Sequence, residues 1–244
     1  GGPDRRTRCT ASAPSARGET GRPRHVVDRT LGLLEALGVT DRDWSFPLRV
    51  EASPGADGPR GRLDAPGSGY VAINPNAAWP TKRWPPERFG AVAAHVRRAH
   101  GRPCVVIWGP GDEARAGAVA AASGGAAAPA PPTDLVELTA LLRAGALLIS
   151  GDTGPLHLAA ALGTPVVGIY GPSDPARNGP WSPADEVVSA FPDCVCAAHR
   201  TRRGRAVHMV RRCRARTGCL DTVSVEQVCR AVDRRLRSLD RDHA

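Results

Sequence analysis

Short apolar segments alternate with helix-forming segments from residue 70 onward, and this alternation restricts the fold more than any other feature of the chain. Residues 70–73, 104–108, 146–150 and 166–170 have the length and apolar character of buried strands. Helix-forming sequence separates these strands, which favours parallel pairing through crossover connections. The pattern therefore predicts an α/β fold with a Rossmann-like parallel sheet that helices cover on both faces.

Periodicity and capping residues mark the helices. Apolar residues recur at helical spacing over residues 25–37, and Gly38 follows as a helix-ending residue. Ser224 and Gln227 form a capping-box sequence for a terminal helix. The helices expected from such signals span residues 25–37, 85–99, 112–122, 133–144 (capped by Thr133), 155–162 (ended by Gly163) and 224–239.

Composition divides the chain into three parts. Residues 1–24 are rich in Arg, Ser, Pro and Gly without apolar periodicity, so we expect a disordered or damaged start. Residues 25–69 comprise the first helix and a Gly/Pro/Asp linker, and residues 70–244 form the sheet domain. The longest Ala-rich stretch is broken by Gly, Ser and Pro, so a membrane span is not expected. No apolar signal core precedes the first helix, which favours a cytoplasmic location.

The net charge of +9 suggests a polyanion partner, so the position of the basic residues matters. They concentrate in residues 1–29 and 199–221, and the remainder of the chain is nearly neutral. The basic segment 199–221 has no interleaved aromatic residue, which nucleic-acid platforms use for base stacking. We therefore expect no nucleic-acid partner. Of the 33 basic side chains only Lys82 is lysine, and the arginine bias is typical of a GC-rich genome.

The loop after the third strand is the first candidate for chemistry. Residues 150–157 read SGDTGPLH, in which small residues permit a tight turn and Pro155 suits the first turn of a helix. The free N–H groups of such a turn bind phosphate, and Thr153 and His157 could add donors. Asp152 would repel a phosphate unless it faces a sugar hydroxyl or a base. The alternative is an ordinary strand-turn-helix in which Asp or Thr only caps the helix.

Two further loops lead to the same edge of the predicted sheet. Thr81 and Lys82 lie in NPNAAWPTKRWP, a stiff loop from which an ammonium could reach a phosphate. A lysine differs from an arginine fork in contact geometry, which makes the single Lys82 notable. In the loop WGPGDE, Asp112 or Glu113 could contact ribose hydroxyls, although acids also cap helices.

Four cysteines crowd into a short C-terminal stretch: Cys194, Cys196, Cys213 and Cys219. They could hold a zinc ion or form a disulfide. Their spacing lacks the usual C-x2-C knuckle, so the sequence leaves both alternatives open.

Taken in order, these motifs resemble the donor-binding half of glycosyltransferase family 9, the bacterial heptosyltransferase family. Residues 151–175, GDTGPLHLAAALGTPVVGIYGPSDP, are similar to its D-[ST]-G-x-x-H-x-A-x-A-x-G-x-P signature and the following G-x-[ST]-x-P loop. Residues 74–89 resemble its K-x-W-P motif, and residues 106–113 a looser third motif. The helix in residues 25–37 resembles the connector before the donor half.

The resemblance implies a GT-B fold, of which this chain represents the donor half, with residues 25–69 a remnant of the acceptor domain. It implies metal-independent, inverting transfer of a heptose-like sugar from a nucleoside diphosphate sugar to a glycan or lipid-linked acceptor, without a cofactor. Lipopolysaccharide-type synthesis would bring peripheral contact with the inner face of the membrane. Lys82 and Asp152 would be catalytic, and no general base is identified. The implied donor-binding residues are Thr81, Lys82, Asp112, Glu113, Asp152, Thr153, Gly154, Pro155 and His157. A truncated, non-catalytic nucleotide-sugar-binding module is the alternative.

Overall fold

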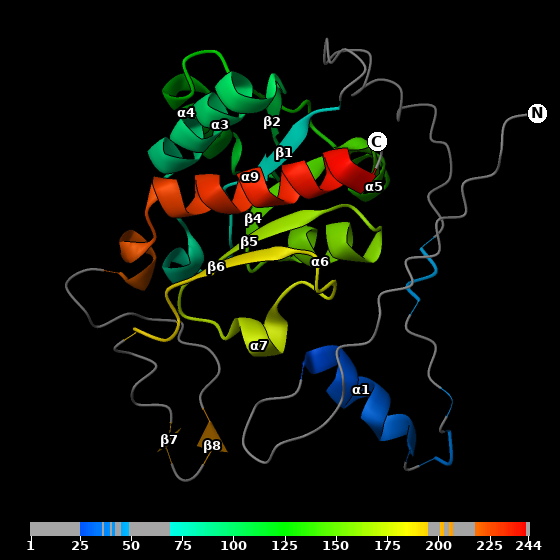
Figure 1. Ribbon diagram of the computed structural model, residues 1–244. Coiled ribbons are helices and arrows are strands. Elements are labelled where there is room, and N and C mark those ends of the chain that lie inside the picture. Colours follow the sequence, from blue (N-terminus) through cyan, green and yellow to red (C-terminus); the bar gives the residue numbers. More distant parts are fainter. Residues whose placement is uncertain are drawn as a thin grey trace, which may run out of the picture.

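The computed structural model describes residues 25–35, 37–39, 41, 45–48, 69–194, 201–202, 205–206 and 218–242 (Figure 1). The expectations for residues 1–24 and for most of the linker lie outside this part of the chain. Among the helices it contains, none combines the length and apolarity needed to cross a membrane.

A parallel sheet forms the centre of the molecule, as the sequence predicts, and it has six strands, two more than the sequence indicates. Its order is β3-β2-β1-β4-β5-β6, the classic doubly wound arrangement. The chain leaves β1 toward one edge and β4 toward the other, so the point between them is a topological switch. The strands are β1 (Val71–Asn74), β2 (Cys104–Val106), β3 (Ala127–Pro129), β4 (Leu147–Gly151), β5 (Val166–Tyr170) and β6 (Glu186–Ser189).

Helices cover both faces of this sheet (Figure 1). They are α3 (Pro86–His100), α4 (Glu113–Ala122), α5 (Leu135–Ala144), α6 (Gly154–Ala161) and α9 (Val225–Asp242), whereas α1 (Val26–Glu35) covers neither face. Shorter elements are η1 (Pro80–Lys82), α7 (Pro175–Asn178), η2 (Cys219–Thr222) and an antiparallel pair, β7 (Thr201–Arg202) and β8 (Arg205–Ala206).

Alternate residues of each strand face two separate cores. Val71 and Ile73 of β1 pack with α3, α4 and α9, whereas Tyr70 and Ala72 pack with α5 and α6. All four of these side chains are buried. Burial on both faces explains why the strands read as continuous apolar runs rather than alternating ones.

The expected helices form with small changes at their ends. The cap of α5 is Asp134 and not Thr133: its Oδ1 accepts a 2.7 Å bond from the Glu137 N–H, and Glu137 Oε2 accepts 2.9 Å from the Asp134 N–H. This reciprocal pair requires an acid three residues after the cap, which only position 134 provides. The capping box of Ser224 and Gln227 forms as predicted, with bonds of 2.8 and 3.3 Å.

The sequence patterns miss β3 and β6. Ala127–Pro129 is only three residues long and contains a proline, which is tolerated because β3 lies at the sheet edge. Glu186–Ser189 has a charged residue and partly exposed side chains, so it lacks the apolar run of a central strand. Both segments gain strand geometry from a neighbour rather than from their own composition.

Helix α1 contacts the sheet domain through its first flanking residue. His25 Nε2 lies 3.0 Å from the Gly179 carbonyl oxygen, and its ring meets Trp181 edge to face at 5.0 Å. The helix itself buries none of its residues, and Leu33 is 70% exposed. Its position therefore depends strongly on this one histidine.

The C-terminal cysteines are only partly described. Cys194 is buried against Phe191, and Cys219 packs against the same pair. Cys196 and Cys213 lie outside the described residues, so the zinc and disulfide alternatives stay untested.

Candidate donor-binding site

A pocket of about 460 Å³ opens at the carboxyl ends of β1, β2 and β4. This is the switch point of the sheet, where ligands bind in doubly wound folds. Residues from the loops after all three strands surround it, together with the start of α5. Its lining consists of Asn74, Asn76, Ala77, Ala78, Trp79, Lys82, Ile107, Trp108, Gly109, Pro110, Asp112, Thr133, Asp134, Leu135, Leu138, Asp152, Thr153, Gly154 and Pro155.

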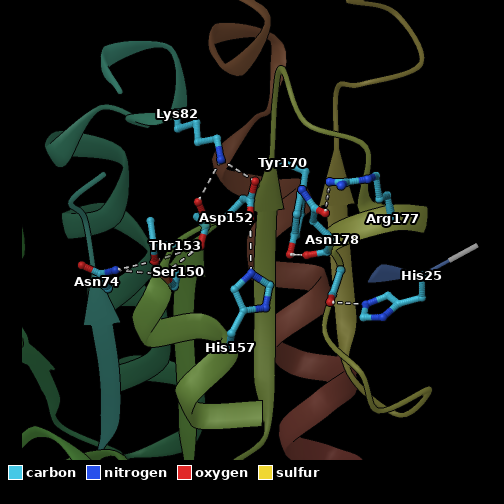
Figure 2. A network of polar contacts seen from close by, with 12 residues as sticks. His25, Asn74, Lys82, Ser150, Asp152, Thr153, His157, Tyr170, Arg177 and Asn178 are labelled. Atoms are coloured by element: carbon cyan, nitrogen blue, oxygen red, sulfur yellow. Dashed lines mark hydrogen bonds and ion pairs between the residues drawn. The ribbon is translucent and has the colours of Figure 1, made fainter. Parts of the chain in front are cut away.

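Lys82 and Asp152 meet at this pocket (Figure 2). Lys82 is the last residue of η1, and its Nζ lies 2.6 Å from Asp152 Oδ2 and 3.4 Å from the Asp152 carbonyl oxygen. The same ammonium lies 4.8 Å from the centre of the Trp79 ring. The side chains are 12% and 6% exposed, so the pair is shielded from water. A partly buried ammonium of this kind is suited to binding an anion.

Asp152 is held in its ionised form. Burial is the strongest single influence on its pKa and raises it, but hydrogen bonds from His157 and Lys82, with further contributions, outweigh burial and lower the pKa to about 2. His157 Nε2 lies 3.4 Å from Oδ1, the oxygen that Lys82 leaves open (Figure 2). The imidazole is 44% exposed, so it borders the site from the solvent side.

Thr153 precedes α6 as its N-cap without using its hydroxyl as a cap. Its Oγ1 instead accepts a 2.9 Å bond from Asn74 Nδ2 and lies 3.1 Å from Ser150 Oγ (Figure 2). Pro155 lies in the first turn, where its missing N–H costs nothing. The Leu156 and His157 N–H groups donate to the Thr153 carbonyl oxygen at 3.2 and 3.5 Å, which leaves the Gly154 N–H without an intrahelical acceptor at the start of α6, where the helix dipole is positive. This end of α6 can therefore bind an anion beside Lys82.

The structure gathers six of the nine sequence-predicted binding residues at the pocket. They are Lys82, Asp112, Asp152, Thr153, Gly154 and Pro155. His157 does not line the pocket itself, but its imidazole contacts Asp152, which does. Thr81, the middle residue of η1, and Glu113, the first residue of α4, do not line the pocket. Asp112 is the residue before α4, and its side chain makes no capping bond there.

Several lining residues were not predicted from the sequence. Trp79 and Trp108 supply aromatic walls, and Leu135 and Leu138 of α5 supply an aliphatic one. Trp108 is fixed by its Nε1, which donates a 2.7 Å bond to the Ala130 carbonyl oxygen. The one available signal is the position of both tryptophans in loops that follow strands. Such walls suit a planar, partly apolar group such as a nucleobase.

The pocket carboxylates do not gather into a metal site. Within the described part of the chain, the side chains close enough together to hold a metal ion are on α3 and α9, away from the pocket.

Comparison with known proteins places this arrangement in a family. The model of glycosyltransferase family 9 (heptosyltransferase) matches residues 4–208. The lipopolysaccharide heptosyltransferase 3 of Escherichia coli K12 is 34% identical over 167 residues, which cover 65% of this chain and 47% of that protein. The lipopolysaccharide heptosyltransferase 1 of Pseudomonas aeruginosa is 31% identical over 175 residues, covering 70% and 47%. The chain thus spans about half the length of these curated relatives.

Solved structures share the fold. A family 9 glycosyltransferase from Veillonella parvula superimposes with a TM-score of 0.70 at 27% identity, covering 88% of this chain and 60% of that one. The E. coli heptosyltransferase WaaC with ADP gives 0.61 at 21% identity, covering 89% and 59%. These neighbours are GT-B glycosyltransferases, and the described sheet corresponds to one Rossmann-like domain of that fold. The chain, with its parallel sheet, switch-point pocket and family-wide match, belongs to glycosyltransferase family 9, the heptosyltransferase family.

Proposed function

We propose that the chain is the donor-binding half of a glycosyltransferase that moves a heptose-like sugar from a nucleoside diphosphate to an acceptor hydroxyl of a lipopolysaccharide-type glycan. The observation that carries the proposal is the Lys82 ammonium, held 2.6 Å from Asp152 beside the start of α6. A cation and a helix N-terminus facing one pocket form a binding site for a diphosphate. The curated relatives, named as lipopolysaccharide heptosyltransferases, support the sugar and the pathway.

The donor would extend from the tryptophan walls to His157. Its base lies between Trp79 and Trp108, its ribose faces Asp112, and its diphosphate lies between Lys82 and the α6 N-terminus. Asp152 pairs with Lys82, so the ammonium offsets the repulsion between this carboxylate and the phosphates, and Asp152 Oδ1 faces the sugar hydroxyls. An adenine base is favoured by the solved relative that carries ADP.

Lys82 would stabilise the leaving group. As the acceptor oxygen bonds to the anomeric carbon, the bond from that carbon to the β-phosphate oxygen breaks, and negative charge grows on the departing diphosphate. The ammonium and the positive end of the α6 dipole face that charge without a metal. Attack opposite the leaving group inverts the anomeric centre. The base that takes the proton of the acceptor hydroxyl is not among the residues assigned here.

A cytoplasmic location at the membrane surface fits this reaction, because nucleotide sugars are cytoplasmic and the acceptor is lipid-linked. The second candidate is a module that binds nucleotide sugars without turnover. It is favoured because no general base for the acceptor hydroxyl is identified among the pocket residues.

Calorimetry with ADP, UDP, GDP and ADP-heptose tests donor binding. We expect one diphosphate to bind, and Lys82→Ala to weaken binding by about tenfold or more through loss of a charge-assisted bond. Arg102→Ala is the matched control, because Arg102 pairs with Asp240 at the other end of the strands. Equal affinity in wild type and Lys82→Ala would refute the site.

A transfer assay separates the two candidates. Sugar transfer from ADP-heptose to a heptose-deficient lipopolysaccharide acceptor supports the enzyme. Tight donor binding without transfer supports the binding module.

A further inference from the structure

Two histidines of α3 contact the same carboxylate oxygen of an aspartate on α9. His95 Nε2 lies 2.8 Å and His100 Nε2 lies 2.7 Å from Oδ1 of Asp233. The three ligand atoms all lie within 4.8 Å of one another. Both imidazoles therefore direct the same ring nitrogen at a common point.

This cluster lies away from the donor pocket. His100 is the last residue of α3, which the chain leaves to enter β2 at Cys104. It is therefore near the amino ends of the strands, whereas the pocket lies at their carboxyl ends. Nothing in the donor chemistry requires these three residues.

The donor set matches a borderline divalent ion. Two imidazole nitrogens and a carboxylate oxygen are standard zinc ligands, at about 2.0–2.2 Å from the ion. Tetrahedral ligands at that distance lie roughly 3.3 Å apart. The present separations of 2.7 and 2.8 Å would thus widen by about half an ångström, a small side-chain movement. The side chains are 21%, 9% and 20% exposed, which leaves access for an ion and for one water ligand.

We propose that His95, His100 and Asp233 bind a divalent transition-metal ion, Zn²⁺ by ligand chemistry, that ties α9 to α3. The ion takes the place of the Nε2 protons that now point at the Asp233 oxygen, and each neutral imidazole then carries its proton on Nδ1. Because the ion joins the C-terminal helix to one that begins beside the donor loops, its role is structural.

Two arginines oppose the ion, of which Arg237 is the more distant, with its Nη2 4.0 Å from Asp233 Oδ2 and its side chain 70% exposed. Arg98 Nη2 lies 3.3 Å from His95 Nδ1, and a guanidinium can only donate, so Nδ1 now accepts. With a metal on Nε2 the imidazole proton moves to Nδ1, and Arg98 must withdraw into solvent. Its exposed position allows this. Arg98→Gln is therefore expected to tighten metal binding, a result that general loss of structure cannot produce.

Calorimetry with ZnCl₂ on the EDTA-treated, reduced chain tests the site. His95→Ala, His100→Ala and Asp233→Asn should each weaken one binding event by about tenfold or more, as loss of a ligand does. Asp240→Asn is the matched control on the same helix, since Asp240 pairs only with Arg102 among the described contacts. Thermal unfolding of each metal-free variant confirms that it is folded.

The seven cysteines of the chain are the competing zinc ligands. CoCl₂ distinguishes them, because thiolate ligation gives an intense charge-transfer band and a His₂Asp site does not. Binding that is lost in the three variants and lacks this band supports the proposal. Absence of binding, equal binding in all variants, or a thiolate band on the bound Co²⁺ would overturn it.

Discussion

Asn74 donates a 2.9 Å hydrogen bond from its side-chain amide to Thr153 Oγ1, so the last residue of β1 positions the residue that opens α6. The same amide lies 3.1 Å from Ser150 Oγ, and Asn74 is only 4% exposed. This bond joins the two strands on either side of the switch point. It keeps the Thr153 hydroxyl from capping α6 and leaves the helix terminus for a ligand.

Removing either partner is expected to destabilise the chain. Asn74→Ala and Thr153→Ala should each lower the free energy of unfolding by about 1–3 kcal/mol, because a buried polar group loses its partner. Urea denaturation of both variants and the double mutant measures the coupling, expected at about 0.5–3 kcal/mol. Thr139→Ala, which removes an exposed bond to the Leu135 carbonyl, should change stability by less than about 0.5 kcal/mol. Strict additivity would show that the two side chains do not interact.

Replacement of Lys82 by arginine tests geometry rather than charge. The Lys82 side chain is only 12% exposed, and a larger planar fork cannot occupy the same position opposite Asp152. We expect Lys82→Arg to weaken ADP binding by about tenfold although the charge is retained. Arg102→Lys, remote from the pocket, should leave the calorimetric affinity unchanged. An undiminished affinity in Lys82→Arg would mean that only long-range charge acts on the ligand.

Asp152 should make the fold acid-sensitive. Its pKa of about 2 lies below the ordinary value of 3.8, so its ionised form stabilises the folded state above pH 4. That contribution, roughly 2 kcal/mol, is lost as the pH falls through 4 toward 2. The stability difference between wild type and Asp152→Asn should therefore shrink over this interval in denaturant titrations. A difference that is constant with pH would show that the Asp152 pKa is not lowered.

Asp185 should act in the opposite direction. Burial raises its pKa to about 6, although the Val166 N–H and Arg235 both donate to its Oδ1. The folded chain therefore holds a proton that the unfolded chain has lost, and this stabilisation is complete below pH 4 and disappears as the pH rises through 6. Between these two pH values we expect the free energy of unfolding of the wild type to fall by roughly 2–3 kcal/mol through this group.

Asp185→Asn isolates this effect, since it keeps an acceptor for the Val166 N–H without the titration. Its free energy of unfolding should be flatter between pH 4 and 6 than that of wild type. If the free energy of unfolding depended on pH in the same way in both proteins, Asp185 would not be the source of the pH dependence.

His25 should control the order of α1. Burial lowers its pKa, and Nδ1 accepts the Val27 N–H at 3.2 Å, so protonation breaks that bond. The bond from the Val27 N–H to His25 Nδ1 is therefore present at pH values above the ordinary pKa of 6.5 and is lost as the pH falls below that value. After correction for intrinsic exchange, hydrogen exchange of the α1 amides should rise on acidification. His25→Ala should show the raised exchange already at pH 7.5, with little change in global stability. Equal protection in both proteins would refute this role.

Much of the fold is readable from the sequence because the central strands are apolar on both faces. The segment predicted over residues 166–170 is confirmed as strand β5, and right-handed crossover connections account for the parallel pairing of the strands. The edge strands escape detection, since Ala127–Pro129 and Glu186–Ser189 carry no such apolar run.

The sequence predicts the charged and polar residues of the site but not its apolar walls. Lys82 and Asp152 stand in motifs that suit phosphate binding, and the structure brings them to 2.6 Å. The aliphatic wall of Leu135 and Leu138 comes from α5, whose cap the sequence predicts at Thr133, one residue before the observed cap. Which face of that helix meets the pocket depends on packing over the sheet, and local sequence does not encode that packing.

The order of the strands also has a kinetic consequence. Asn74 and Thr153 are 79 positions apart, and β1 pairs with β4 only across a long loop of intervening chain. Such non-local closure slows folding, since its entropy cost precedes any contact that repays it. In a chain made from its N-terminus, β1 and β2 can associate early, but the ligand cavity closes only after β4 has emerged. The part of the molecule that would bind the donor can thus form only after residues 147–151 have been synthesised.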